Sequence, residues 1–178
     1  GNKGTILSSL TTVKPSGTVS QLVNSSSGIH PRFSAYYIRR VRANNKDPLA
    51  VLMQAQGFPC EADVANANNL VFAFPVAAPD GARLAADVDA ITQCKLWAAY
   101  IEHWADHSVS CTIYYSDDEF LELGQWVWAH FNTITGLSFL PRSEHSYRQA
   151  PYEEITAEQY TALLAAMPSD VDWSELAR

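Results

Sequence analysis

The sequence predicts an α/β fold in which strands alternate with amphipathic helices. Two apolar runs, "LVFAFPV" at 70–76 and "SVSCTIYY" at 108–115, are typical of strands, and the segment between them, Leu84–His107, has apolar residues at helical spacing. Strands separated by helices favour parallel pairing through right-handed crossovers. We therefore expect a parallel core of at least three strands, formed by Leu70–Phe74, Val109–Tyr115 and Leu137–Leu140.

The other elements carry local start and stop signals. Tyr36–Arg42 is typical of a strand. Acidic residues in a first turn and capping boxes mark helix starts. Three helices are expected from these signals. The first is capped by Asp47, has Pro48 in its first turn and stops at Gly57. The second spans Asp117–Asn132, and the third runs from Thr156 to Met167. The tryptophans at 97, 104, 126 and 128 are expected to pack in the core or between helices.

The stretch "TTVKPSGTVSQLV", Thr11–Val23, indicates a strand, a tight turn and a helix start. Pro15 and Gly17 punctuate the turn, and Thr18 or Ser20 is a candidate cap for a helix that continues to Val23. A small-residue loop between a strand and a helix is the layout of an anion site, because glycine permits close approach and first-turn N–H groups are unpaired. The alternative is an ordinary capped turn, and the loop lacks the Gly-Lys-Thr or Gly-Lys-Ser ending of a Walker A motif.

Charge is distributed unevenly along the chain. Residues 1–46 carry seven basic and no acidic residues, whereas residues 47–178 carry five basic and 19 acidic residues, which gives the net charge of −7. The acidic balance argues against general nucleic-acid binding. The basic segment contains the candidate anion loop and therefore favours a small polyanion such as a nucleotide, although a merely solvated basic strand is the alternative.

Length and composition place the chain in a simple class. A chain of 178 residues with 47% hydrophobic content is expected to form one domain, 1–178, with its own core. The apolar runs are too short for a membrane span, and the N-terminus has no signal-peptide pattern, so we expect a cytoplasmic protein.

The cysteines and histidines give no catalytic or metal signature. Cys60, Cys94 and Cys111 form no Cys-x-x-Cys pair, which fits a reduced compartment, and Cys94 and Cys111 are expected to be buried and inert. His103 and His107 are four residues apart on the expected helix, but the His-Glu-x-x-His pattern and a third ligand are missing. We therefore predict no metal site.

Several segments of the chain together resemble a known family. "TTVKPSGTVSQLVNSSSGIHPRFSAYYIRRVR", "DPLAVLMQAQGFPCEADV", "FAFPVAAP", "GLSFLP", "YRQAPYEEIT" and "MPSDVDWSEL" occur in order along almost the whole sequence. They resemble the C-terminal region of ribonucleotide reductases, above all the adenosylcobalamin-dependent (class II) ribonucleoside-triphosphate type. The likeness is specific because separate segments match in the same order.

The resemblance implies both a fold and a site. The fold is the ten-stranded α/β barrel of these enzymes, with mostly parallel strands, of which this chain would supply the last part. The site is the loop that holds the phosphates of the substrate, a ribonucleoside triphosphate or diphosphate. Carried over to this sequence, the phosphate-binding residues are Ser16, Gly17, Thr18, Val19 and Ser20. Arg32 is a secondary candidate contact, whereas His30 is expected to be structural.

The resemblance also implies what this segment lacks. The family converts ribonucleotides to 2′-deoxyribonucleotides by cobalamin-initiated radical chemistry that uses a thiyl cysteine, a redox cysteine pair and a glutamate upstream of this region. The family's C-terminal cysteine pair would follow "WSELAR". The three cysteines present match none of these, so we expect a fragment that has no catalytic residue and is inactive alone. Its partners would be the N-terminal part of the reductase and a thioredoxin-like reductant, with adenosylcobalamin bound by the parent enzyme and not by this segment.

Two other readings remain beside the reductase fragment. One is a stand-alone module that binds a nucleotide or phosphate, and the other is a structural half that folds fully only against its partner. An incomplete barrel exposes sheet edges and apolar faces, which fits the second reading. An upstream reading frame that encodes the cysteine-bearing part of a reductase would favour the fragment.

Overall fold

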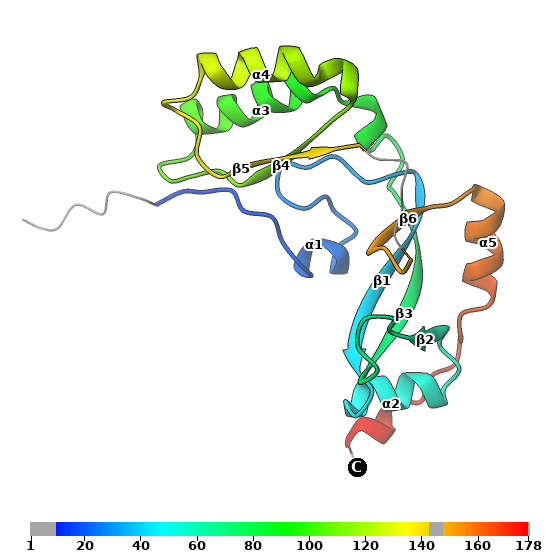
Figure 1. Cartoon of the computed structure of the whole chain (residues 1–178). Coiled ribbons are helices and arrows are strands. Elements are labelled where there is room, and N and C mark those ends of the chain that lie inside the picture. The colour runs from blue at the N-terminus through cyan, green and yellow to red at the C-terminus, as the bar shows by residue number, and fades with distance from the viewer. Residues whose placement is uncertain (1–9, 143–147, 178) are drawn as a thin grey trace, which may run out of the picture. The chain divides into compact units, whose positions relative to one another are not determined.

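The computed structural model describes residues 10–142 and 148–177, which belong to two compact units. The first unit is formed by Gly1–Arg32 and Pro79–Glu144, and the second by Phe33–Ala78 and His145–Arg178. The candidate phosphate loop lies in the first unit. Figure 1 labels the elements of both units along the chain.

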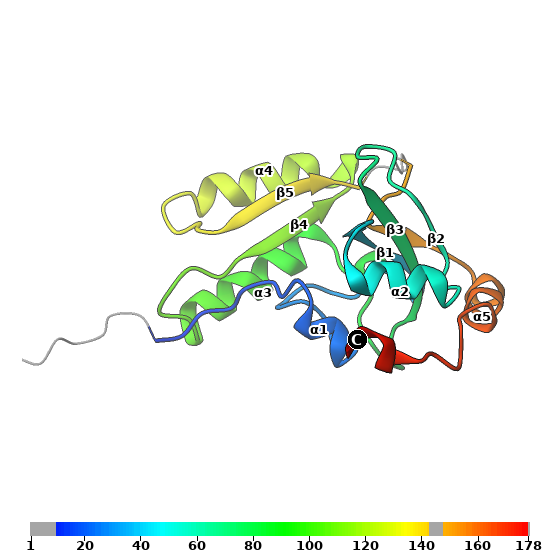
Figure 2. The ribbon, with the colours of Figure 1, turned by 90° about the horizontal axis from the view of Figure 1, so that it is seen from below.

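The first unit is built on two parallel strands and two helices. β4 (Cys111–Tyr115) pairs with β5 (Leu137–Pro141) in register from Cys111 opposite Leu137. α4 (Phe120–Ala129) connects the two strands, and α3 (Ala90–His103) precedes β4. Figures 1 and 2 show both helices on the same side of the strand pair. This β–α–β crossover confirms the α/β class and the parallel pairing expected for these two strands.

The strict alternation around β4 gives the unit its core. Val109 and Ile113 are fully buried, and Cys111 is 3% exposed. Trp97 of α3 packs against this face with 1% of its surface exposed, and its indole N–H donates to the carbonyl of Val109 at 2.9 Å. The alternation therefore predicts the buried face of the strand correctly, and the one polar group of Trp97 is satisfied.

The helix expected over Leu84–His107 is shorter than its apolar spacing indicates. A 3₁₀ turn, η1 (Ala85–Asp87), precedes α3, which begins after Asp89 because the carboxylate of Asp89 accepts the N–H of Thr92 at 2.6 Å. α3 ends at His103. His103 and His107 are consequently not on one helix, and their four-residue spacing does not bring them to one helical face.

The expected helix over Asp117–Asn132 is also divided. η2 (Asp117–Glu119) is a 3₁₀ turn opened by a capping box between Ser116 and Glu119, and α4 follows directly. Glu119 has a second role, because its carboxylate accepts the N–H of Ala90 at 2.7 Å, the first residue of α3. The acidic run is thus a helix start, as predicted, and one of its members also caps another helix.

The second unit is an antiparallel sheet with the strand order β2-β3-β1-β6. β1 (Tyr36–Asn44) pairs along its whole length with β3 (Asn69–Ala77), from Tyr36 opposite Ala77 to Asn44 opposite Asn69. β2 (Cys60–Ala62) and β6 (Tyr152–Glu154) are the outer strands. The helices of this unit are α2 (Pro48–Ala55), α5 (Ala157–Ala165) and the 3₁₀ turn η3 (Trp173–Ala177).

The predicted parallel core of three strands is therefore wrong. The segment Leu70–Phe74 lies in β3, which pairs antiparallel with β1 and β2 in the second unit, apart from β4 and β5. The three arginines of β1, Arg39, Arg40 and Arg42, fit this arrangement, because a half-exposed antiparallel sheet accepts polar residues that a fully buried parallel sheet excludes. A mostly apolar run identifies a strand but does not identify its partner.

Local signals in the second unit predict its helices well. Asp47 caps α2 by accepting the N–H of Leu49 at 2.9 Å, Pro48 is its first residue, and Gly57 follows with φ of +84°. α5 begins with the expected capping box between Thr156 and Gln159. No helix of residues 10–142 or 148–177 is long and apolar enough to cross a membrane.

Candidate functional site

The candidate site is the loop from Ser16 to Ser20 in the first unit. It follows an extended segment, Thr11–Val13, which lies along 107–110 through backbone hydrogen bonds from His107 to Thr11 (3.1 Å) and from Ser110 to Val13 (3.0 Å). The structure assigns no β-strand there, so the predicted strand is an extended segment beside the start of β4. Along the loop, Gly17, Thr18 and Val19 are exposed, and Ser16 is half-buried.

The backbone N–H groups of the loop differ in whether they have an internal acceptor. The N–H of Ser16 donates to the Ser27 hydroxyl at 2.8 Å, and the N–H of Ser20 donates to the Ser16 hydroxyl at 3.0 Å. Within the part of the chain that the structure describes, the N–H groups of Thr18 and Val19 have no acceptor. Two adjacent unpaired N–H groups on exposed residues can donate to an anionic oxygen.

The helix after the loop is too short to support the dipole argument. α1 (Val19–Leu22) is one turn, and Thr18 makes no side-chain cap. It ends because Asn24 adopts φ of +48° and the N–H of Ser25 donates to Ser20 O at 2.7 Å. A macrodipole is a sum over aligned peptides, so a single turn contributes little of it. The donors of the loop itself, and not a helix terminus, are the chemical feature of the site.

Gly17 has open space on its side-chain face. A Cβ added to Gly17 would meet nothing within 4 Å, and Gly17 does not have a positive φ. Neither backbone strain nor crowding by the chain therefore requires glycine here. A reason that remains is an approaching ligand, because the absence of a side chain lets an external group reach the backbone.

Ser20 carries a buried hydroxyl at the inner side of the loop. Ser20 is 6% exposed, and its Oγ has no hydrogen-bond partner among the described residues. Buried polar atoms are nearly always paired, so an unpaired hydroxyl within the candidate loop is notable.

Arg32 lies beneath the segment that follows the loop. It is 3% exposed, and its guanidinium donates to the carbonyl of Ser25 at 2.9 Å and to the side-chain carbonyl of Asn24 at 2.8 Å. These contacts hold the chain reversal after α1. Arg32 is thus buried within this segment. A secondary contact between Arg32 and an anion stays a prediction.

Two of the three cysteines, Cys94 and Cys111, are far from an activated state. Burial raises the pKa of Cys94 to about 12, assisted by the nearby charges of Cys111 and Asp89. Burial also raises the pKa of Cys111, although a hydrogen bond from Gln93 partly offsets it. Cys60 is half-buried on β2 and is a free thiol. Reactive thiols need a lowered pKa and access, so Cys94 and Cys111 are structural.

The structure brings no metal-binding cluster together. No group of three or more His, Cys, Asp or Glu side chains able to hold a metal ion occurs within residues 10–142 and 148–177. His103 and His107 are both exposed, and His103 lies 3.8 Å from the carboxylate of its neighbour Glu102.

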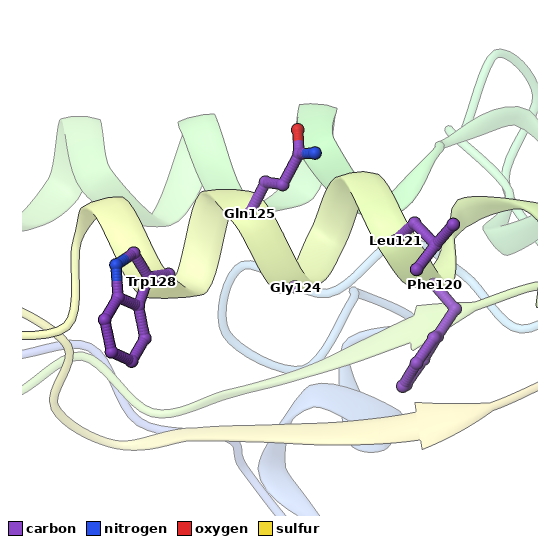
Figure 3. Close-up of a pocket in the computed structure, with 5 residues that line it drawn as sticks. All are labelled: Phe120, Leu121, Gly124, Gln125 and Trp128. Atoms are coloured by element: carbon purple, nitrogen blue, oxygen red, sulfur yellow. The ribbon is translucent and has the colours of Figure 1, made fainter.

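Sequence reasoning missed an apolar hollow on α4. Figure 3 shows its lining, which is Phe120, Leu121, Gly124, Gln125 and Trp128. Leu121 is 77% exposed and Trp128 is 83% exposed. The expectation that Trp128 and Trp104 pack in the core or between helices is therefore wrong, since Trp104 is also 60% exposed. Residues 121, 124, 125 and 128 recur at helical spacing, and that periodicity is the signal that would have marked this face.

Comparison with known proteins decides the family. The model of the ribonucleotide reductase barrel domain matches residues 1–130, which is most of the chain. The chain belongs to the ribonucleotide reductase barrel-domain family. The resemblance inferred from the separate motifs is thereby confirmed, and so is the α/β class of the barrel.

Individual relatives match far beyond the loop. The adenosylcobalamin-dependent ribonucleoside-triphosphate reductase of Levilactobacillus brevis is 34% identical over 165 residues, which cover 90% of this chain and 22% of that reductase. The reductase of the same name from Euglena gracilis is 37% identical over 170 residues, which cover 93% of this chain and 23% of the relative. This chain therefore spans less than a quarter of the length of these relatives.

A solved structure has a similar fold. The crystal structure of a B12-dependent (class II) ribonucleotide reductase superposes with a TM-score of 0.77 at 32% identity. The superposition covers 93% of this chain and 23% of the other one. The described elements thus reproduce a part of that larger reductase fold.

Proposed function

We propose that this chain is part of an adenosylcobalamin-dependent ribonucleoside-triphosphate reductase, in which it holds the phosphates of the substrate. The contacts would come from the loop Ser16–Ser20. The single observation that carries this proposal is the pair of unpaired N–H groups on the exposed residues Thr18 and Val19, next to the open side-chain face of Gly17. Membership of the reductase barrel family supplies the substrate class.

The loop would bind phosphate oxygens by charge-assisted hydrogen bonds. The two N–H groups and the hydroxyls of Thr18 and Ser20 are donors, and an ionised phosphate offers several acceptors. Each such bond contributes about 1.5–3 kcal/mol. The loop carries no carboxylate, so no like charge opposes a polyphosphate there.

The chemical step would be supplied by the rest of the reductase. Removal of a 2′-hydroxyl by this chemistry needs a thiyl radical and a reducing thiol pair, and the buried thiols of Cys94 and Cys111 meet neither requirement. The relatives are named adenosylcobalamin-dependent reductases, so this cofactor would supply the radical chemistry in the parent enzyme. The hollow on α4 is formed by a single helix and is too small for a corrinoid, so we assign none of its residues to the cofactor.

The partners in this proposal follow from the same chemistry. The remaining part of the reductase carries the catalytic thiols, and a thioredoxin-like protein restores them after each turnover. The substrate is a ribonucleoside triphosphate, as in the names of the relatives. We place the assembled enzyme in the cytoplasm, where free thiols such as those of this chain remain reduced.

Binding of tripolyphosphate to the chain tests the proposal. In ¹H–¹⁵N spectra, we expect the amide signals of Thr18 and Val19 to shift on titration. Gly17→Val should weaken the binding, because its side chain occupies the open face of the loop. The matched control is Gly124→Val, since a Cβ at Gly124 also meets nothing within 4 Å. Binding that leaves the loop signals unchanged, or that Gly17→Val does not weaken, contradicts the proposal.

A further inference from the structure

We propose that Ser27 and His30 are positioning residues that connect the phosphate loop to β4. The inference rests on the proposed function of the loop and adds how its donors are held in place. Neither side chain belongs to the loop, and both are half-buried. Together they form a continuous line of hydrogen bonds from Ser16, through Ser27 and His30, to Thr112 of β4.

The first link is the hydroxyl of Ser27. It accepts the N–H of Ser16 at 2.8 Å and donates to the carbonyl of the same residue at 3.0 Å. A hydroxyl can fill both roles at once, so one side chain fixes both polar groups of Ser16. The Ser16 hydroxyl in turn accepts the N–H of Ser20 at 3.0 Å. Ser27 therefore orients the start of the loop and, through Ser16, its end.

The second link is the imidazole of His30. Its Nδ1 lies 2.7 Å from the carbonyl oxygen of Ser27, and its Nε2 lies 2.9 Å from the backbone N of Thr112. A carbonyl only accepts, and a backbone N–H only donates. These partners assign the tautomer, in which Nδ1 carries the proton and Nε2 is the acceptor.

The third link anchors the line in the parallel strands. Thr112 lies in the middle of the β4–β5 pairing, opposite Ser138. The N–H of Thr112 donates to Nε2 of His30, so the imidazole satisfies a backbone donor of the strand. The next residue, Ile113, is fully buried in the core, so the strand gives the loop a well-packed reference point.

Gly28 makes the arrangement fit sterically. Its φ of +58° turns the chain between Ser27 and His30, and an added Cβ would lie 3.1 Å from the carbonyl oxygen of Lys14. The backbone that leads into the loop therefore passes directly against the backbone that carries Ser27. A side chain at position 28 would separate the two segments.

The consequence is a loop whose donors are oriented before the ligand arrives. Without the Ser27 hydroxyl, the backbone N–H and carbonyl of Ser16 lose their contacts with Ser27, and ligand binding must first order the loop. Preorganisation of this kind changes affinity more than folding, because the affected residues lie outside the core around Trp97.

The test compares Ser27→Ala with Ser27→Thr by tripolyphosphate titration of the whole chain. Ser27→Ala should weaken binding about tenfold, whereas Ser27→Thr keeps the hydroxyl and should restore it to within about twofold. Ser26→Ala is the matched control, because Ser26 is the neighbouring half-buried serine and takes no part in the line of hydrogen bonds from Ser16 to Thr112. The ¹⁵N signals of the His30 ring should show a protonated Nδ1 in the wild-type chain.

Each outcome decides a separate claim. If the wild-type chain binds no tripolyphosphate, the proposed function fails, and this inference fails with it. If the wild-type chain binds and Ser27→Ala binds equally well, or if Ser27→Thr is as weak as Ser27→Ala, the positioning role alone is wrong. Should Ser27→Ala not fold, His30→Gln gives the answer, because it keeps an acceptor for Thr112 but offers no donor at the Nδ1 position. Wild-type affinity in that variant also overturns the inference.

Discussion

Trp97 shows how much of the first unit depends on single residues. It is 1% exposed, packs edge-on against Trp126 at 6.3 Å, and donates its indole hydrogen to Val109. Trp128 lies on the next helix, α4, and is 83% exposed. Two tryptophans of similar sequence context therefore have opposite structural roles.

Replacing these two tryptophans should give very different stabilities. Trp97→Ala should lower the free energy of unfolding by about 3–5 kcal/mol, because it leaves a large cavity and an unpaired carbonyl at Val109. Trp128→Ala should change it by less than about 0.5 kcal/mol. Urea unfolding followed by far-ultraviolet circular dichroism measures both. Equal losses for the two variants would show that the assigned core is wrong.

The thiols should differ in reactivity in the order of their burial. A thiol-specific reagent at about pH 8 should label Cys60 first, because burial holds Cys94 and Cys111 as protonated thiols whose pKa values are raised. Peptide mass spectrometry after short labelling times identifies the modified residue. Labelling of Cys94 before Cys60 in the folded chain is the outcome that the structure forbids.

At the scale of elements, Glu119 joins two helices through one carboxylate. It accepts the N–H of Ala90 at the start of α3 and both the N–H and hydroxyl of Ser116 before η2, each at 2.7 Å. Burial acts to raise the pKa of Glu119, but these hydrogen bonds outweigh it and lower the pKa below its ordinary value of 4.5. The carboxylate form is therefore the one that the fold prefers.

Glu119→Gln should make the chain less stable at neutral pH and less sensitive to acid. Because the folded pKa is lowered, the stabilisation is present above pH 4.5 and is lost as the pH falls through the folded value. The loss at neutral pH should be about 1 kcal/mol, as for other N-caps. Urea unfolding at neutral and at acidic pH measures the difference. A variant whose stability falls with acid as steeply as that of the wild type excludes this role for Glu119.

The elements also show where sequence reasoning succeeds. Helix starts at Asp47 and Thr156 were predictable because their hydrogen bonds span only a few residues. The pairing of β3 with β1 was not, since a strand run carries no information on direction or partner. Helix α3 was predicted too long because the spacing of its apolar residues continues through η1, where the backbone tightens into a 3₁₀ turn.

The candidate site was predictable only in part, for the same reason. Gly17 and its neighbouring hydroxyls mark a loop by composition, and the family resemblance gives it a ligand. The contacts that hold it join Ser16 to Ser27 and His30 to Thr112, which are 11 and 82 residues apart. Local sequence patterns do not predict contacts between residues so far apart in the chain, so these contacts are visible only in the folded structure.

At the scale of the whole molecule, the chain spans 22–23% of the length of its reductase relatives. It forms two compact units, and the expectation of a single domain stays a prediction. The described residues include the loop that we propose for phosphate binding, and burial raises the pKa values of the Cys94 and Cys111 thiols. The division of labour in the proposed enzyme therefore separates substrate holding from radical chemistry.

The chain alone should reduce no ribonucleotide. Holding a substrate without a radical relay gives binding and no turnover. Incubation with adenosylcobalamin, a dithiol and each ribonucleoside di- and triphosphate, followed by chromatography for the deoxy product, measures this. Product formation that Cys60→Ala, Cys94→Ala or Cys111→Ala abolishes would make that cysteine catalytic and contradict the expected lack of activity.

A crystal structure of the chain with a ribonucleoside triphosphate tests the central claim most directly. We expect phosphate oxygens within hydrogen-bond distance of the N–H groups of Thr18 and Val19, with Gly17 against the ligand and the Ser16–Ser27 contact retained. Phosphates bound elsewhere on the chain, with the loop unoccupied at saturating ligand, would contradict it.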